Sequence, residues 1–334
     1  ECAFGDHGSA QCRVVAENHY ARILTPGGTE LRFHAAGETD PSSWDAHGVF
    51  EMALGGDVKA RPAGLTDFAL SIDPRDGGAT EVTVVLENVA RDEIVTIDDV
   101  EVPFDGAGTA RSLTMPLADG IVWVRGERPC ADAYRIVAAG DVQTGPTQFE
   151  RIIEHLHVEA EAAEAAGEQL LGLLLLGDLA ENPAEDELRL VETILRRSPV
   201  PVAVTPGNHD VHGDEMALFN RIYGPGNHAF DACRTRIALL DTGGADLAES
   251  IEARLPEFLE REDDEFLVVG THYPAWSGRT GNGWRDEPVA WRLLSELARF
   301  DADLLVAGHY HNWRDYPRVQ VGDREVPEIL SGTL

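Results

Sequence analysis

The stretch LLGLLLLGDLAEN, residues 170–182, passes from an almost unbroken apolar run through a glycine into polar residues. Such a run is typical of a strand buried on both faces, as in parallel sheets covered by helices. Five more runs of this kind occur: YRIVAAG (134–140), VPVAVTPG (200–207), RIALLDTG (236–243), EFLVVG (265–270) and ADLLVAG (302–308). Amphipathic helical patterns lie between them at residues 147–167, 184–197 and 287–300. We therefore predict a layered α/β domain, an α/β sandwich, over residues 132–334.

The first 131 residues follow a different pattern. Short alternating stretches rich in β-branched residues are separated by turn formers such as DPRDGG and FDGAG, and we expect strands at RVVA (13–16), 22–28, 49–56, 79–89, 93–104, 111–117 and 120–127. This spacing, without a helical pattern, predicts an all-β sandwich domain over residues 1–131, of immunoglobulin-like or jelly-roll type. Histidines 7, 19, 34 and 47 show no ligand spacing and are expected at the surface or in turns.

The composition narrows the class of protein. The 334-residue chain is 43% hydrophobic, which is enough for two domains with sizeable cores, and its formal net charge is −32. A surface this acidic repels phosphate backbones, so we expect no nucleic-acid partner. No run of 18 apolar residues is present, so we expect no transmembrane segment. The sequence does not indicate an oligomeric state.

The cysteines favour an oxidising compartment. The four cysteines, Cys2, Cys12, Cys130 and Cys233, form no CxxC pair and allow three disulfide connectivities. Cys2 and Cys12 bracket a Gly/Ser-rich stretch and are the pair we expect. The chain begins at Glu1 without a methionine, which we interpret as a processed N-terminus of an exported protein. Free thiols in a cytosolic protein are the alternative.

Polar side chains follow the predicted strands where the strands end. Because the carboxyl ends of strands in an α/β sheet lie at one edge, we expect these side chains to gather there: Asp141, Gln143, Asp178, Asn208, His209, His272, His309 and His311. Each carries an oxygen or imidazole donor that suits manganese, iron or zinc. A single fragment of this kind is more often a turn or a helix cap, but five fragments in order predict a metal site.

These fragments carry a family resemblance. GDVQ, GDLAE, GNHD, THYP and GHYHN resemble the signature of the calcineurin-like metallophosphoesterases, which runs D-x-H, G-D-x-x-D/N, G-N-H-D/E, a lone His and G-H-x-H. The β-rich half ahead of this region, together with GHYHNWRDYP, is most similar in layout to the purple acid phosphatase branch. Two residues depart from the pattern. Gln143 stands where the family has a histidine, and Glu181 where that branch has a metal-binding tyrosine.

The resemblance implies a dimetal site. One metal ion would be held by Asp141, Gln143, Asp178 and His311, and the other by Asp178, Asn208, His272 and His309. A hydroxide between the two ions would attack the phosphate ester directly, while His209, oriented by Asp210, would assist the leaving group. Two divalent or mixed-valence ions of manganese, iron or zinc are implied. Calcium is a further possibility at the Gln143 site, because an amide oxygen is a harder donor than an imidazole.

The resulting hypothesis is a dimetal-dependent hydrolase that acts on a phosphorylated small molecule or another phosphate ester. A phosphodiesterase or nucleotide pyrophosphatase with the same site is one alternative. A catalytically weak metal-binding recognition protein is another, which Gln143 favours and the intact Asn208-His209-Asp210 run opposes. His212 and His228 are either surface residues, which we expect, or part of the border of the cleft. The Gly-rich loop at 277–284, flanked by Trp276, either lines the substrate pocket or is only a connection.

Overall fold

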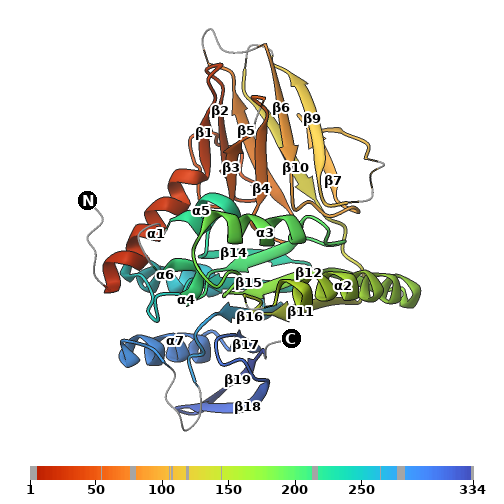
Figure 1. The fold of residues 1–334 in the computed structure, drawn as a ribbon. Helices are drawn as coiled ribbons and strands as arrows, with labels where there is room; N and C mark the ends of the chain where they lie inside the picture. Colours follow the sequence, from red (N-terminus) through yellow and green to blue (C-terminus); the bar gives the residue numbers. More distant parts are fainter. Residues whose placement is uncertain are drawn as a thin grey trace.

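The computed structural model describes residues 6–331, except residues 54, 76–79, 105, 107, 118–119, 144, 213–216, 264 and 277–282. The fold is mixed α/β with several sheets, and a β-rich part formed by the first half of the chain stands on an α/β part formed by the second (Figure 1). Within the described residues, no helix is both long enough and apolar enough to cross a bilayer.

Two sheets from the first half of the chain share one hydrophobic core. The larger sheet has the order β1-β2-β5-β10-β7-β8 and the smaller one β3-β4-β6-β9. Their bounds are β1 Arg22–Leu24, β2 Glu30–His34, β3 Gly48–Met52, β4 Val58–Pro62, β5 Phe68–Asp73, β6 Glu81–Leu86, β7 Ile94–Ile97, β8 Val100–Glu101, β9 Arg111–Pro116 and β10 Val122–Glu127. Phe33, Leu70 and Val124 of one sheet and Phe50 and Val84 of the other belong to the same buried cluster. The strands expected between residues 79 and 127 are confirmed, whereas an immunoglobulin-like or jelly-roll topology stays a prediction.

The chain enters the fold through a helix. Helix α1 (Asp6–Tyr20) includes RVVA, so the prediction of a strand at residues 13–16 is wrong. Ala10 and Val14, four residues apart, are buried in a core cluster of the second half of the chain, while Val15 is exposed. Burial of this one face decides the conformation against the β-propensity of the two valines, because propensity is weak beside tertiary packing. α1 therefore contacts α5 and α6 of the α/β part.

The six apolar runs are all strands, and they are divided between two sheets. The smaller sheet is parallel and consists of β11 (Tyr134–Ala139), β12 (Gln169–Leu176) and β13 (Val202–Thr205). The larger sheet has the order β14-β15-β16-β17-β19-β18, with β15, β16, β17 and β19 parallel and the two outer strands antiparallel to their neighbours. Its bounds are β14 His228–Ala232, β15 Thr235–Leu240, β16 Phe266–Thr271, β17 Leu304–Ala307, β18 Arg314–Val321 and β19 Arg324–Leu330.

Burial on both faces explains the unbroken apolar run that predicted β12. Leu173 and Leu175 face a cluster with α2 (Pro146–Ala166), α3 (Glu185–Leu195) and α5 (Leu218–Tyr223). Leu174 and Leu176 face the other way, into a cluster between the two sheets that also contains Ile237 of β15. The outer face of the larger sheet is covered by α6 (Glu249–Leu259) and α7 (Glu287–Arg299). The predicted helices at 147–167, 184–197 and 287–300 are thereby confirmed as α2, α3 and α7.

A disulfide joins the segment between the halves to the α/β part. Cys130 follows β10, and it is bonded to Cys233 in the turn between β14 and β15, with the two Cα atoms 5.5 Å apart. Nearby, the Arg128 guanidinium donates to the carbonyl oxygens of Leu65, Leu170 and Leu171. The pairing of Cys2 with Cys12 stays a prediction, because Cys2 lies outside the described residues.

Candidate metal centre

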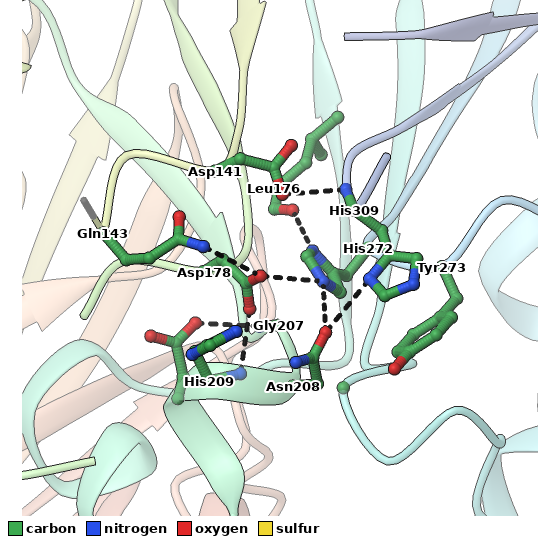
Figure 2. A network of polar contacts seen from close by, with 12 residues as sticks. Asp141, Gln143, Leu176, Asp178, Gly207, Asn208, His209, His272, Tyr273 and His309 are labelled. Carbon is green, nitrogen blue, oxygen red and sulfur yellow. Dashed lines mark hydrogen bonds and ion pairs between the residues drawn. The ribbon is translucent and has the colours of Figure 1, made fainter. Parts of the chain in front are cut away.

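The carboxyl ends of strands from both sheets meet at one place (Figure 2). Asp141 and Asp178 follow β11 and β12, Asn208 begins the short helix α4 (Asn208–Val211) after β13, and His272 and His309 follow β16 and β17. Four residues here have positive φ angles: Asp141 (59°), Asp178 (56°), His309 (74°) and His311 (48°). Left-handed backbone costs energy for residues other than glycine and tends to occur at functional sites. Its concentration at the strand ends marks this edge as a site.

Two groups of donor side chains share one carboxylate. Asp178, His272 and His309 form one group, and Asp141, Asp178 and His311 form the other. In each group, one ligand atom from every residue lies within 4.8 Å of the others. Figure 2 shows Asp178 between Gln143 on one side and His272, Asn208 and His309 on the other. The shared position of Asp178 is the geometry that a bridging ligand requires.

His272 is fixed by its Nδ1 atom, which lies 2.9 Å from the carbonyl oxygen of Leu176. The Nδ1–H donates this bond, so Nε2 faces Asn208 Oδ1 at 3.1 Å and Asp178 Oδ2 at 3.4 Å. Burial alone would lower the pKa of His272, but Asp178 and Asp141 raise it above its usual value. Burial alone would raise the pKa of Asp178, but His272 and the N–H of His209 hold it below its usual range. His272 Nε2 and the Asp178 carboxylate therefore lie where both can bind the same positively charged group.

Two buried oxygen atoms at the site, Asp141 Oδ2 and Gln143 Oε1, have no hydrogen-bond partner among the residues that the structure describes. Asp141 Oδ1 accepts the N–H of His309 at 2.9 Å, and burial raises the pKa of Asp141 to about 6. An unpaired buried polar atom costs about 1–3 kcal/mol, so it is uncommon unless a ligand completes it. The donor set therefore fits cations: two carboxylates, unpaired oxygens and imidazoles.

Gln143 lies inside this cluster and is 7% exposed. Its Nε2 is 3.4 Å from both Asp178 Oδ2 and His311 Nε2. A half-turn of the amide exchanges Nε2 and Oε1, and would place the oxygen beside Asp178 and His311. Glu181 does not belong to either donor group, because its exposed side chain lies on the side of His209.

His209 and Asp210 have different partners from those expected. The Asp210 carboxylate accepts the backbone N–H groups of Leu179 (2.8 Å), Ala180 (3.0 Å) and Gly207 (2.8 Å). Burial raises its pKa to about 7, and Asp178 acts in the same direction. His209 Nδ1 lies instead 2.9 Å from the carbonyl oxygen of Glu181. The expectation that Asp210 orients His209 is therefore wrong: Asp210 ties together the loops after β12 and β13, and the Glu181 carbonyl orients the ring.

Two residues near His272 and His309 were not predicted. Thr242 Oγ1 accepts the backbone N–H groups of His272 and Tyr273. The Tyr273 ring packs on His309 with the ring centroids 3.9 Å apart, and burial raises its pKa to about 12. Tyr273 could have been predicted to lie near the site, because it directly follows His272 in THYP. No feature of the sequence indicated Thr242.

Other expectations have mixed outcomes. His212 is exposed, as predicted. His228 and His34 are buried, so placing them at the surface was wrong, and burial lowers the pKa of His228 to about 3. Trp284 is buried and donates to the carbonyl oxygen of Pro274, but the preceding part of the Gly-rich loop, 277–282, lies outside the described residues.

A two-sheet α/β domain that gathers carboxylates, amides and imidazoles at the ends of its strands is typical of metal-dependent enzymes. The chain belongs to the calcineurin-like phosphoesterase family, whose sequence model matches residues 134–313. The predicted family is therefore confirmed.

Individual relatives are distant. A protein of Fibrobacter succinogenes named probable cyclic nucleotide phosphodiesterase is 25% identical over 149 residues, which cover 42% of this chain and 57% of that protein. A purple acid phosphatase from yellow lupin seeds has a TM-score of 0.49 at 11% identity, over 81% of this chain and 63% of that one. A dimetal phosphatase from Danio rerio has a TM-score of 0.46 at 14% identity, over 59% and 87%. The chain thus spans less than two thirds of the first two proteins.

Proposed function

We propose that this chain hydrolyses phosphate esters with two divalent cations bound at the strand ends. Asp141, Gln143, Asp178 and His311 would hold the first cation, and Asp178, Asn208, His272 and His309 would hold the second, so Asp178 would be common to both. The observation that carries the proposal is the pair of donor groups that share Asp178. The unpaired oxygens of Asp141 and Gln143 support it, because a cation would complete both.

When bound, the cations would lower the pKa of a water molecule and polarise the phosphoryl oxygens. The chain's own residues set the geometry. Asn208 Oδ1, within 3.1 Å of His272 and 3.0 Å of His309, keeps the two imidazoles turned toward one point. Burial and the neighbouring His272 lower the pKa of His309 to about 4, which leaves it neutral and able to ligate at neutral pH.

His209 assists the leaving group in this proposal. Its Nδ1 is held by the Glu181 carbonyl oxygen, which leaves Nε2 as the nitrogen that donates a proton. A water molecule releases one proton to solvent and attacks phosphorus directly, the bond to the leaving oxygen breaks, and that oxygen takes the proton held at His209 Nε2. No covalent phosphoenzyme forms. The backbone N–H of His209 donates to Asp178 Oδ1 at 2.9 Å, which links the proposed acid to the shared ligand.

Gln143 sets the metal preference. A neutral amide oxygen binds less tightly than an imidazole and prefers harder cations, so the first site favours Mn²⁺, Fe²⁺ or Ca²⁺ over Zn²⁺. The substrate is a phosphorylated small molecule, because a net charge of −32 opposes binding of nucleic-acid backbones. Phosphodiesters are the second candidate class, supported by the name of the relative from Fibrobacter succinogenes.

The decisive experiment is a substrate and metal screen on the protein stripped of metal. Nitrophenyl phosphate and bis-nitrophenyl phosphate represent monoesters and diesters, each assayed with Mn²⁺, Fe²⁺, Zn²⁺ and Ca²⁺. We expect turnover that is highest with Mn²⁺ and that falls by about 10²–10⁴-fold in Asp178→Asn. Tight binding of two cations without turnover of either ester would reject the hydrolase in favour of a metal-binding recognition protein.

We also propose that the protein is exported. The Cys130–Cys233 disulfide supports this, because disulfides persist mainly in oxidising compartments. Mass spectrometry of the protein isolated from its native cells, alkylated before lysis, tests the proposal. Alkylated Cys130 and Cys233 would contradict it.

A further inference from the structure

A buried ion pair joins α1 to the end of β15. Arg13 Nε and Nη2 donate to Asp241 Oδ2 at 2.6 Å and Oδ1 at 3.0 Å. The two side chains are 0% and 1% exposed. α1 lies outside residues 134–313, the region that the family model matches, so this contact adds an element to the family's domain.

Asp241 is followed in the sequence by Thr242, which contacts the metal centre directly. Thr242 is fully buried, and its Oγ1 accepts the backbone N–H groups of His272 at 3.0 Å and Tyr273 at 2.9 Å. The Asp241 carboxylate also accepts the N–H of Gly243 at 3.0 Å, so it fixes the turn that presents Thr242. Arg13 is therefore linked to the backbone of His272 by three connections. These are the ion pair with Asp241, the peptide bond from Asp241 to Thr242, and the hydrogen bond of Thr242 with His272.

The same turn also supports the loop of Asn208. A Cβ atom added to Gly243 would lie 2.8 Å from the carbonyl oxygen of Gly207, so the two backbones are in direct contact. Since Gly207 immediately precedes Asn208, displacement of the 241–243 turn would disturb a second proposed ligand of the same cation.

A second side chain of α1 acts in parallel. Glu17 Oε1 accepts the backbone N–H groups of Gly226 at 2.9 Å and Asn227 at 3.1 Å. Asn227 Oδ1 in turn accepts the N–H of Asp241 at 2.9 Å. The buried side chains of Arg13 and Glu17 are thus both directed at the segment behind the metal centre.

Stability alone does not account for this arrangement. A buried ion pair is often no more stabilising than apolar residues of the same volume, because desolvation offsets the attraction. A bidentate Arg–carboxylate pair does, however, fix two groups in one geometry. Residues that orient metal ligands through hydrogen bonds typically change metal affinity or activity by about 10–100-fold when they are lost.

We propose that α1 is an integral part of the metal centre, and that Arg13 is a positioning residue which holds His272, through Asp241 and Thr242, in place for the second cation. The inference rests on the proposed dimetal function.

The test uses the full chain stripped of metal and Mn²⁺ as the probe. Arg13→Met removes the pair, and Arg13→Lys keeps the charge without the bidentate geometry. Arg128→Met is the matched control, because Arg128 is also a buried arginine that holds backbone carbonyls, but at the start of β12, away from the site. The readouts are the Mn²⁺ binding isotherm and hydrogen exchange of the His272 and Tyr273 amides.

We expect Arg13→Met to weaken Mn²⁺ binding at the second site by about 10–100-fold, and to leave the first site unchanged within about twofold. Exchange of the His272 and Tyr273 amides should accelerate, with partial rescue in Arg13→Lys and no change in Arg128→Met. Wild-type affinity and amide protection in Arg13→Met would overturn the proposal and reduce α1 to a structural element.

A second variant keeps the proposal testable if Arg13→Met does not fold. Thr242→Val removes the acceptor of the two amides but leaves the Arg13–Asp241 pair in place, and we expect the same loss of second-site affinity. Unchanged affinity in Thr242→Val would overturn the proposed route. Failure of the proposed function is separately visible: a wild type that turns over no ester would still report positioning through its amide exchange.

Discussion

Replacing Asp178 by asparagine is the most discriminating perturbation of the proposed centre. The carboxylate belongs to both donor groups, whereas His311 belongs to only one. Asparagine keeps the shape but substitutes an N–H₂ donor for one oxygen and removes the negative charge between the cations. We therefore expect both sites to lose metal in Asp178→Asn, and His311→Ala to empty only the first.

The expected magnitude follows from the number of interactions lost. Loss of one orienting partner changes metal affinity or activity by about 10–100-fold. Asp178 acts on both cations, so the two effects multiply to a loss in kcat/KM of about 10²–10⁴-fold, or about 3–5 kcal/mol in transition-state stabilisation.

The assay measures metal content per chain after equilibration with Mn²⁺, together with turnover of a nitrophenyl ester. His311→Ala serves as the control, because its side chain is 43% exposed and its loss leaves no buried cavity. Two bound metal ions per chain in Asp178→Asn would refute the bridging role. Equal metal loss in both variants would show that the two sites are not organised around Asp178.

Four further outcomes are expected. His209→Ala should slow poor leaving groups by about 10²–10⁴-fold and nitrophenolate far less, and equal losses on both would exclude proton donation. Gln143→His should tighten Mn²⁺ and Zn²⁺ binding at the first site, measured by titration with a competing chelator, and no change would mean that Gln143 ligates nothing. Burial raises the pKa of Glu93 to about 8, so Glu93 binds its proton more tightly in the folded protein than in the unfolded chain. The stabilisation that this proton contributes is fully present below pH 4.5 and is lost as the pH rises through 8. Unfolding free energy should fall over that window with a slope of up to about 1.4 kcal/mol per pH unit from this group, and the decline should flatten in Glu93→Gln. Leu174→Ala should cost about 2–5 kcal/mol of unfolding free energy in urea, because the side chain is buried between the two sheets.

The order of strand ends along the chain was sufficient to predict that these polar side chains lie close together. Asp141, Asp178 and His309 come together because each follows a strand whose carboxyl end reaches the same edge, and this depends only on local sequence. The apolar run of β12 predicted its burial for the same reason.

Contacts between distant segments could not be predicted in this way. α1 is helical because Ala10 and Val14 find a surface on the other half of the chain, a condition invisible in RVVA itself. The partners of Asp210 were not predicted either. Its carboxylate is adjacent to His209 in the sequence, but it accepts backbone N–H groups from the loop after β12. Strand β18 was not predicted, because its side chains are mostly exposed and lack an apolar pattern.

The docking of α1 also has a consequence for synthesis of the chain on the ribosome. Arg13 and Asp241 are 228 residues apart. At about 5–20 residues per second, α1 leaves the ribosome roughly 10–50 s before its partner does. The β-rich half can pair its strands during this interval, because its sheets are formed by residues between 22 and 127. α1 must wait, with its buried face exposed, until β15 has formed, so closure of the metal centre is a late event in the maturation of the chain.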